Sequence, residues 1–145
     1  EDMTGKRYMS LDLGDVRIGV AVSDTMGIVA GARETYRRRG DDSDFKHIAD
    51  LIQAQNAGVV VIGLPLNMDG TKGPRALMAE EWGAKLAALT DAKVVYQDER
   101  LTTVTSERVL IESGMRREKR KNVIDRVAAA VILQTYLDNP LKLPL

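Results

Sequence analysis

RYMSLDL at residues 7–13 and RIGVAV at residues 17–22 decide the fold of this chain. In both segments apolar residues alternate with other residues, which is the pattern of a strand with one buried face. In the first strand, Tyr8, Ser10 and Asp12 fall on the expected polar face. The short link between the two segments predicts an antiparallel hairpin.

The rest of the chain predicts alternating helices and strands around this hairpin. The run VVVIG at 59–63 is continuously apolar and β-branched, which is typical of a central parallel strand covered on both faces. The other expected elements are a third strand near 29–36, a helix at 43–56 capped by Ser43 or Asp42 and stopped by Gly58, a helix at 75–89, a strand at 93–97, and helices at 103–113 and 122–137, the last opening at Asn122. This order predicts an α/β domain with a mixed five-stranded sheet, in which two parallel strands extend three antiparallel strands and helices cover both faces.

Length and composition restrict the kinds of site that the chain can hold. With 145 residues, we expect one domain over 1–145, of which residues 1–6 are disordered or left over from an expression vector. Cysteine is absent and His47 is the one histidine, so any metal must be bound by oxygen ligands. No apolar run approaches the roughly 20 residues of a membrane span and no secretory signal is recognisable, so we expect a cytoplasmic protein without a membrane segment.

The formal net charge of zero conceals a basic C-terminal third. Residues 1–99 hold 12 Lys or Arg against 16 Asp or Glu, whereas residues 100–145 hold 9 against 5. Much of this excess lies in a predicted loop at 116–121, with Arg116, Arg117, Lys119, Arg120 and Lys121. Such a dense cluster attracts polyanions, so we expect it to contact a nucleic-acid backbone; the alternative is a solvated loop.

Three carboxylates lie at positions where an acidic residue is unusual. Asp12 lies within a strand, Glu99 ends the last strand, and Asp125 lies in the first turn of the last helix among apolar residues. Each has an ordinary explanation alone: a turn residue, an ion pair with Arg100, and a favourable interaction with the helix dipole. In the predicted sheet all three could meet at one edge, where they would repel each other without cations. We therefore hypothesise a site for Mg²⁺ or Mn²⁺, which prefer oxygen ligands and support phosphodiester hydrolysis.

Four segments, in this order, resemble a known family: LDLGDVRIGVAVSD at 11–24, GLPLNMDGTKGP at 63–74, DERLTTVTSERVL at 98–110 and IDRVAAAVILQTYL at 124–137. The family is that of the bacterial proteins proposed to be Holliday junction resolvases or pre-16S ribosomal RNA nucleases. The resemblance implies a ribonuclease H-like fold and a divalent-metal-dependent nuclease. It implies that Asp12, Glu99 and Asp125 are the catalytic and metal-binding residues. It also suggests Arg17 and Arg100 as nucleic-acid contacts, although Arg17 is equally suited to a structural ion pair.

More than one substrate and more than one class of function are compatible with the sequence. We expect processing of the 5′ end of pre-16S rRNA, a structured RNA, with resolution of four-way DNA junctions as the alternative. Symmetric junction cutting requires a homodimer, whereas RNA trimming is possible for a monomer. Two rival classes are an ATP-handling enzyme of the actin and sugar-kinase type, for which one domain is too small, and a non-catalytic module that binds nucleic acid or a ribosome-assembly partner.

Overall fold

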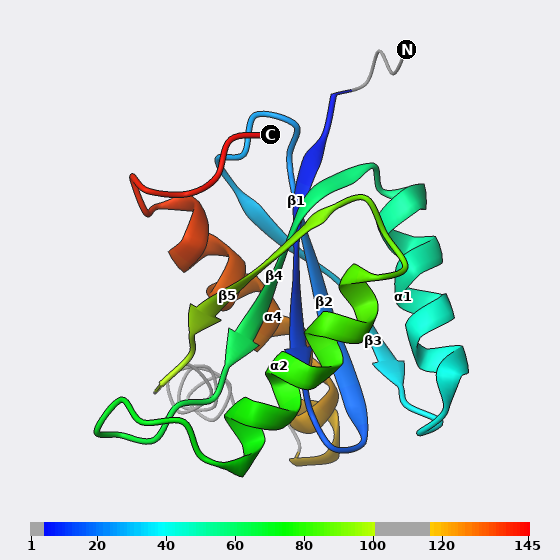
Figure 1. Cartoon of the computed structure of the whole chain (residues 1–145), viewed down its shortest axis with the longest axis vertical. Coiled ribbons are helices and arrows are strands. Elements are labelled where there is room, and N and C mark those ends of the chain that lie inside the picture. Colours follow the sequence, from blue (N-terminus) through cyan, green and yellow to red (C-terminus); the bar gives the residue numbers. More distant parts are fainter. Residues whose placement is uncertain (1–4, 101–116) are drawn as a thin grey trace.

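A mixed five-stranded sheet forms the centre of the molecule (Figure 1). The computed structural model describes residues 5–100 and 117–145, and the side chains of residues 5–100 and 127–145. The strands are β1 (Arg7–Leu13), β2 (Arg17–Ser23), β3 (Ala30–Arg37), β4 (Ala57–Leu64) and β5 (Lys93–Asp98), in the spatial order β3-β2-β1-β4-β5. β1, β2 and β3 pair antiparallel, and β1, β4 and β5 pair parallel. The predicted α/β architecture is therefore confirmed.

Two helices, α1 (Asp42–Ala54) and α2 (Pro74–Ala87), follow β3 and β4. The cap of α1 was predicted one or two residues too late, because Asp41 accepts the hydrogen bond from the Ser43 N–H at 2.9 Å. At the other end of α1 the left-handed residue is Asn56, with φ of 54°, and Gly58 already belongs to β4. Asparagine tolerates this conformation better than most residues, so it ends the helix in place of the glycine.

The C-terminal helix, α4 (Arg117–Leu137), begins earlier than the sequence suggested. Its start was predicted at Asn122, but Arg and Lys are good helix formers, and the helix extends back through the basic segment. The predicted loop at 116–121 is thus wrong for Arg117, Lys119, Arg120 and Lys121, which lie in the first turns of α4, and Asp125 lies well inside the helix. Arg116 and the predicted helix at 103–113 lie outside the described residues.

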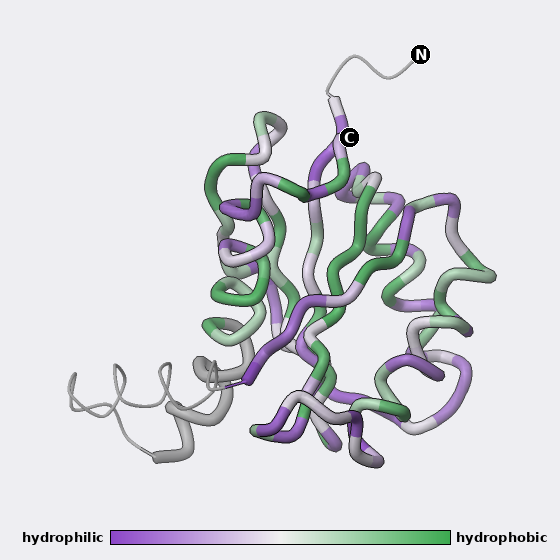
Figure 2. The backbone as a smooth tube through the Cα atoms, turned by 60° about the vertical axis from the view of Figure 1, so that its left-hand side comes forward, coloured by the Kyte–Doolittle hydropathy of each residue, from purple (hydrophilic) through white to green (hydrophobic). Residues whose placement is uncertain are grey.

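The sheet is buried on both faces. α1 and α2 pack on one face and α4 packs on the other, and the tube view shows apolar strands between these two layers (Figure 2). The face of β1 that was expected to be polar is covered by α4, so that Tyr8 is only 3% exposed and Ser10 is fully buried. The Ser10 hydroxyl donates to the Ala129 carbonyl of α4, which satisfies the polar group at this contact. Consequently Asp12, on the same face of β1, also points to the α4 side.

β1, β4 and β5 end at one edge of the sheet, which also carries the β1–β2 hairpin and the start of α2 (Figure 1). This is the edge at which ligands usually bind in α/β sheets with parallel strands. None of the helices in the described part of the chain combines the length and the apolar character needed to cross a lipid bilayer.

Candidate active site

Two of the predicted carboxylates meet at this edge. Asp12 lies near the end of β1, and Glu99 directly follows β5. The Glu99 N–H donates to the Leu64 carbonyl at 3.2 Å, which fixes the Glu99 backbone against the end of β4. The two side chains share a hydrogen bond on the α4 side of the sheet. The structure therefore brings Asp12 and Glu99 together from strands that are not neighbours.

The electrostatics of the pair favour an uncharged Glu99 in the absence of a cation. Burial, then the neighbouring Asp12 charge, then the hydrogen bond with Asp12 raise the pKa of Glu99 to about 8. The positive charge of Arg75 opposes this rise. At neutral pH Glu99 thus keeps its proton, and its O–H donates the hydrogen bond to the Asp12 carboxylate, because two adjacent, half-buried carboxylates do not readily ionise together.

One oxygen of Glu99 is left without a partner. Glu99 Oε2 is buried and accepts no hydrogen bond, which is costly for a polar atom. It faces Gly63 of β4, whose missing side chain leaves the space that the carboxylate fills. Hard divalent cations prefer oxygen ligands, and Glu99 Oε2 together with the Asp12 carboxylate supplies them. The residues present therefore fit Mg²⁺ or Mn²⁺.

The third predicted carboxylate is placed by its backbone alone. Asp125 lies in α4 two turns before Ile132, and a Cβ added at Gly63 would meet both the Ile132 side chain and Glu99. The side chain of Asp125 lies outside the described residues. Within the described part, Asp, Glu and His side chains nowhere form a group of three that could hold a metal.

Arg100 is held by its own neighbours. Its Nη2 lies 2.6 Å from Asp98 Oδ2 and its Nε donates to the same oxygen at 2.8 Å, so the partner of Arg100 is Asp98 and the suggested ion pair with Glu99 is wrong. Arg100 Nη1 also donates to the Met68 carbonyl at 3.1 Å. Arg100 therefore fastens the loop after β4 to the end of β5. Asp98 lies on the face of β5 opposite to Glu99, as strand alternation predicts.

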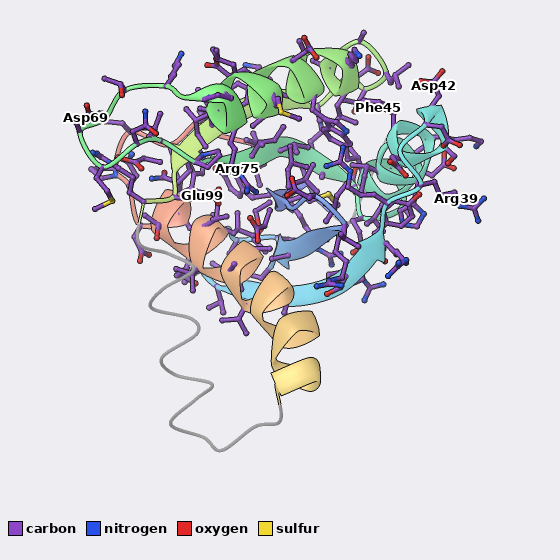
Figure 3. The ribbon with its side chains drawn as sticks, turned by 90° about the horizontal axis from the view of Figure 1, so that it is seen from below. Arg39, Asp42, Phe45, Asp69, Arg75 and Glu99 are labelled. Atoms are coloured by element: carbon purple, nitrogen blue, oxygen red, sulfur yellow. The ribbon has the colours of Figure 1, made fainter. Side chains whose placement is uncertain are left out.

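Arg75 was not recognised in the sequence, although its charge acts on Glu99. It is the second residue of α2, and Figure 3 shows it beside Glu99 at the edge of the sheet. Its Nη1 lies 3.9 Å from Asp15 of the β1–β2 hairpin. Arg75 also lines a pocket on the side of α2, together with Leu13, Asp15, Arg38, Pro65, Met78, Ala79, Glu81, Trp82 and Lys85. Its position, directly after the loop that follows β4, was the signal that could have identified it.

The predicted contacts that the structure describes, apart from Arg100, lie around the same edge (Figure 1). Arg17 opens β2 opposite Arg37 of β3, next to the β1–β2 hairpin. The basic residues 117, 119, 120 and 121 belong to the start of α4, and their side chains lie outside the described residues.

Sequence comparison identifies a family and close relatives. Residues 6–139 match the family described as "RuvX: Holliday junction resolvase". A protein of Halalkalibacterium halodurans is 46% identical over 134 residues, which cover 91% of this chain and 96% of the relative. A protein of Streptococcus equi subsp. equi is 47% identical over 135 residues, which cover 91% and 97%. Both relatives carry the name "Putative pre-16S rRNA nuclease".

Solved structures show the same fold at low sequence identity. T. thermophilus RuvC in complex with a Holliday junction substrate has a TM-score of 0.60 and 12% identity, and the match covers 97% of this chain and 99% of that chain. Fowlpox virus resolvase in complex with Holliday junction DNA has a TM-score of 0.56 and 16% identity, with coverage of 94% and 99%. The sheet and its helices therefore form a ribonuclease H-like fold, as the sequence resemblance implied.

Proposed function

Because this chain belongs to the RuvX Holliday junction resolvase family, we propose that it is a divalent-metal-dependent nuclease that hydrolyses phosphodiester bonds of structured nucleic acid. The observation that carries the proposal is the half-buried pair of Asp12 and Glu99 at the carboxyl edge of the parallel strands, in which Glu99 Oε2 is a buried oxygen without a partner. A buried carboxylate with an orphaned oxygen is unfavourable for stability alone, but it becomes favourable once a cation is bound.

We assign Mg²⁺ or Mn²⁺ to Asp12, Glu99 and Asp125. The chemistry that such an ion supplies is neutralisation of charge on the phosphate and activation of the attacking water. Asp12 and Glu99 provide the negative charge that holds the ion, and burial of the Glu99 Oε2 atom limits competition by solvent. Arg75 keeps a positive charge next to the pair, which suits a polyanionic substrate approaching this edge.

The basic residues around the site are assigned to the substrate backbone. We propose that Arg17 of β2 and Arg116, Arg117, Lys119, Arg120 and Lys121 at the start of α4 contact phosphates. Arg100 is already engaged by Asp98 and Met68, so its contribution to nucleic-acid binding is to hold the loop after β4 in place.

For the substrate, we propose the 5′ end of pre-16S rRNA in ribosome biogenesis, which agrees with the name of the relatives. We also propose a cytoplasmic location, where such a substrate would be met. Resolution of four-way DNA junctions is the second candidate, favoured by the description of the family. The two differ in assembly, because a monomer suffices for trimming RNA while symmetric junction cutting needs two active sites in a homodimer.

A cleavage assay on both substrates tests this proposal. A pre-16S rRNA leader and a synthetic four-way junction are incubated with wild type, Asp12→Asn and Asp50→Asn in Mg²⁺ or Mn²⁺. Asp50 pairs with Lys46 on the exposed side of α1, so Asp50→Asn is a matched control that should cut like wild type. Asp12→Asn should lower cleavage on the order of 100-fold or more, because it removes charge from the metal site. Absence of cleavage of either substrate with either metal would instead favour a non-catalytic binding module.

A further inference from the structure

Asp12 and Glu99 meet across a strand that separates them. β4 lies between β1 and β5 in the sheet, so neither side chain can reach the other through the sheet. In register, Leu11 of β1 pairs with Ile62 of β4, and Gly63 pairs with Gln97 of β5. Gly63 therefore lies beside Asp12, and the Glu99 carboxylate, two residues after Gln97, reaches back over Gly63.

The space above Gly63 is already filled by Glu99 and α4. A Cβ built on Gly63 would lie 2.3 Å from Glu99 Oε2, 3.0 Å from Glu99 Cδ and 2.6 Å from Ile132 Cδ1. Real Cβ atoms essentially never come closer than 3.0 Å to another heavy atom, as this Cβ would to Glu99 Oε2 and Ile132 Cδ1. The backbone of Gly63 is ordinary strand without a positive φ, so the need for glycine here is steric.

Of the two neighbours, Glu99 has more freedom to move. Ile132 is 1% exposed and packs in the core between α4 and the sheet. The Glu99 backbone is fixed by its hydrogen bond to Leu64, so a methyl group at position 63 would displace the carboxylate end of the side chain. That displacement would separate Glu99 from Asp12.

We propose that Gly63 is a positioning residue of the metal site: its missing side chain lets the Glu99 carboxylate lie over β4 within reach of Asp12, so that both bind one divalent cation. The inference rests on the proposed metal-dependent function. If Gly63 served only the packing of α4 on the sheet, a side chain at position 63 would disturb that packing without changing metal binding.

Gly83 of α2 offers a matched control on the opposite face of the sheet. A Cβ at Gly83 would lie 2.3 Å from the Tyr96 hydroxyl oxygen and 2.9 Å from Ile62 Cδ1, so it is as crowded as Gly63 but belongs to the other core. Gly63→Ala and Gly83→Ala should both lower the melting temperature, and only Gly63→Ala should weaken metal binding.

The test measures Mn²⁺ affinity by isothermal titration calorimetry for wild type, Gly63→Ala, Gly83→Ala, Glu99→Gln and the double variant Gly63→Ala/Ile132→Ala. Gly63→Ala should weaken Mn²⁺ binding about 10–100-fold, as loss of supporting contacts at metal sites typically does. Gly83→Ala should stay within about twofold of wild type. The double variant removes the clash with α4, so it replaces Gly63→Ala in the test if that variant does not fold. Its Mn²⁺ affinity should remain low.

Two outcomes of the titrations would overturn the inference: wild-type affinity in folded Gly63→Ala, or recovery of affinity in the double variant. A crystal structure of Gly63→Ala gives a readout without metal, in which Glu99 should have lost its contact with Asp12; a retained contact would also overturn the inference. By contrast, wild-type Mn²⁺ affinity in Glu99→Gln, or no Mn²⁺ binding by wild type, would refute the proposed metal site. The crystal structure of Gly63→Ala would then show whether Gly63 positions Glu99.

Discussion

Raising the pH from 6 to 8.5 is expected to tighten Mn²⁺ binding at the pair formed by Asp12 and Glu99. Burial of Glu99, the Asp12 charge and the shared hydrogen bond raise the pKa of Glu99 to about 8 in the metal-free protein. A divalent ion binds the ionised carboxylate, so the proton must leave when the ion binds. Because the metal-free state holds the proton and the metal-bound state does not, affinity rises with pH.

The size of this effect follows from the pKa. With a pKa of about 8, Glu99 is about 99% protonated at pH 6, about 90% at pH 7 and about one quarter at pH 8.5. The apparent affinity should therefore increase about tenfold for each pH unit up to about 8 and level off above it. Binding of one ion should release about 0.9 proton at pH 7 and about a quarter of a proton at pH 8.5.

Isothermal titration calorimetry in buffers of different ionisation enthalpy measures both quantities. The slope of the apparent binding enthalpy against the buffer enthalpy is the number of protons released. Glu99→Gln is the control, because it cannot release this proton and its weaker binding should vary little with pH. Constant wild-type affinity between pH 6 and 8, proton release near zero at pH 7, or an unchanged pH dependence in Glu99→Gln would refute the electrostatic reasoning.

Three further predictions concern stability and loop order. Because the pKa of Glu99 is raised in the fold, the metal-free protein loses stability as the pH rises from about 4.5 through 8. In EDTA, Glu99→Gln should therefore be more stable than wild type by about 2–4 kcal/mol at pH 8.5 and equal to it at pH 4. Urea denaturation that shows no such divergence between the two proteins would contradict this prediction. Asp44 is buried and accepts hydrogen bonds from the Tyr36 hydroxyl at 2.8 Å and the Arg39 N–H at 2.8 Å, so Asp44→Ala should lower the free energy of unfolding at pH 7 by about 2–4 kcal/mol, and a loss below about 1 kcal/mol would count against it. Asp98→Ala frees Arg100 from its ion pair, so hydrogen exchange in residues 65–73 should become faster while exchange in α1 stays unchanged; equal loop exchange in both proteins would exclude the fastening role of Arg100.

Local patterns explain which parts of this fold were predicted correctly. Alternation in β1 and β2 depends on residues two apart, and the β-branched run of β4 depends on adjacent residues, so both strand signals are set within a few residues whatever packs on them later. Asp12 and Glu99 could be selected for the same reason, because a carboxylate within a strand or at its end conflicts with its surroundings. The start of α4 was missed because Arg and Lys suit a helix as well as a loop, so the sequence there does not favour one boundary.

The sequence alone thus determined the five strands, the mixed sheet and the helices α1, α2 and α4 apart from their ends, and it singled out Asp12 and Glu99. Tertiary structure decided which surfaces those elements share: α4 covers the side of β1 that looked polar, Glu99 reaches Asp12 over Gly63, and Arg100 turns to Asp98. The physical reason is one of range. Side-chain spacing is set within a few residues, whereas the burial, pKa and steric space of Glu99 arise from strands and a helix that lie far apart in the chain and meet only when it folds.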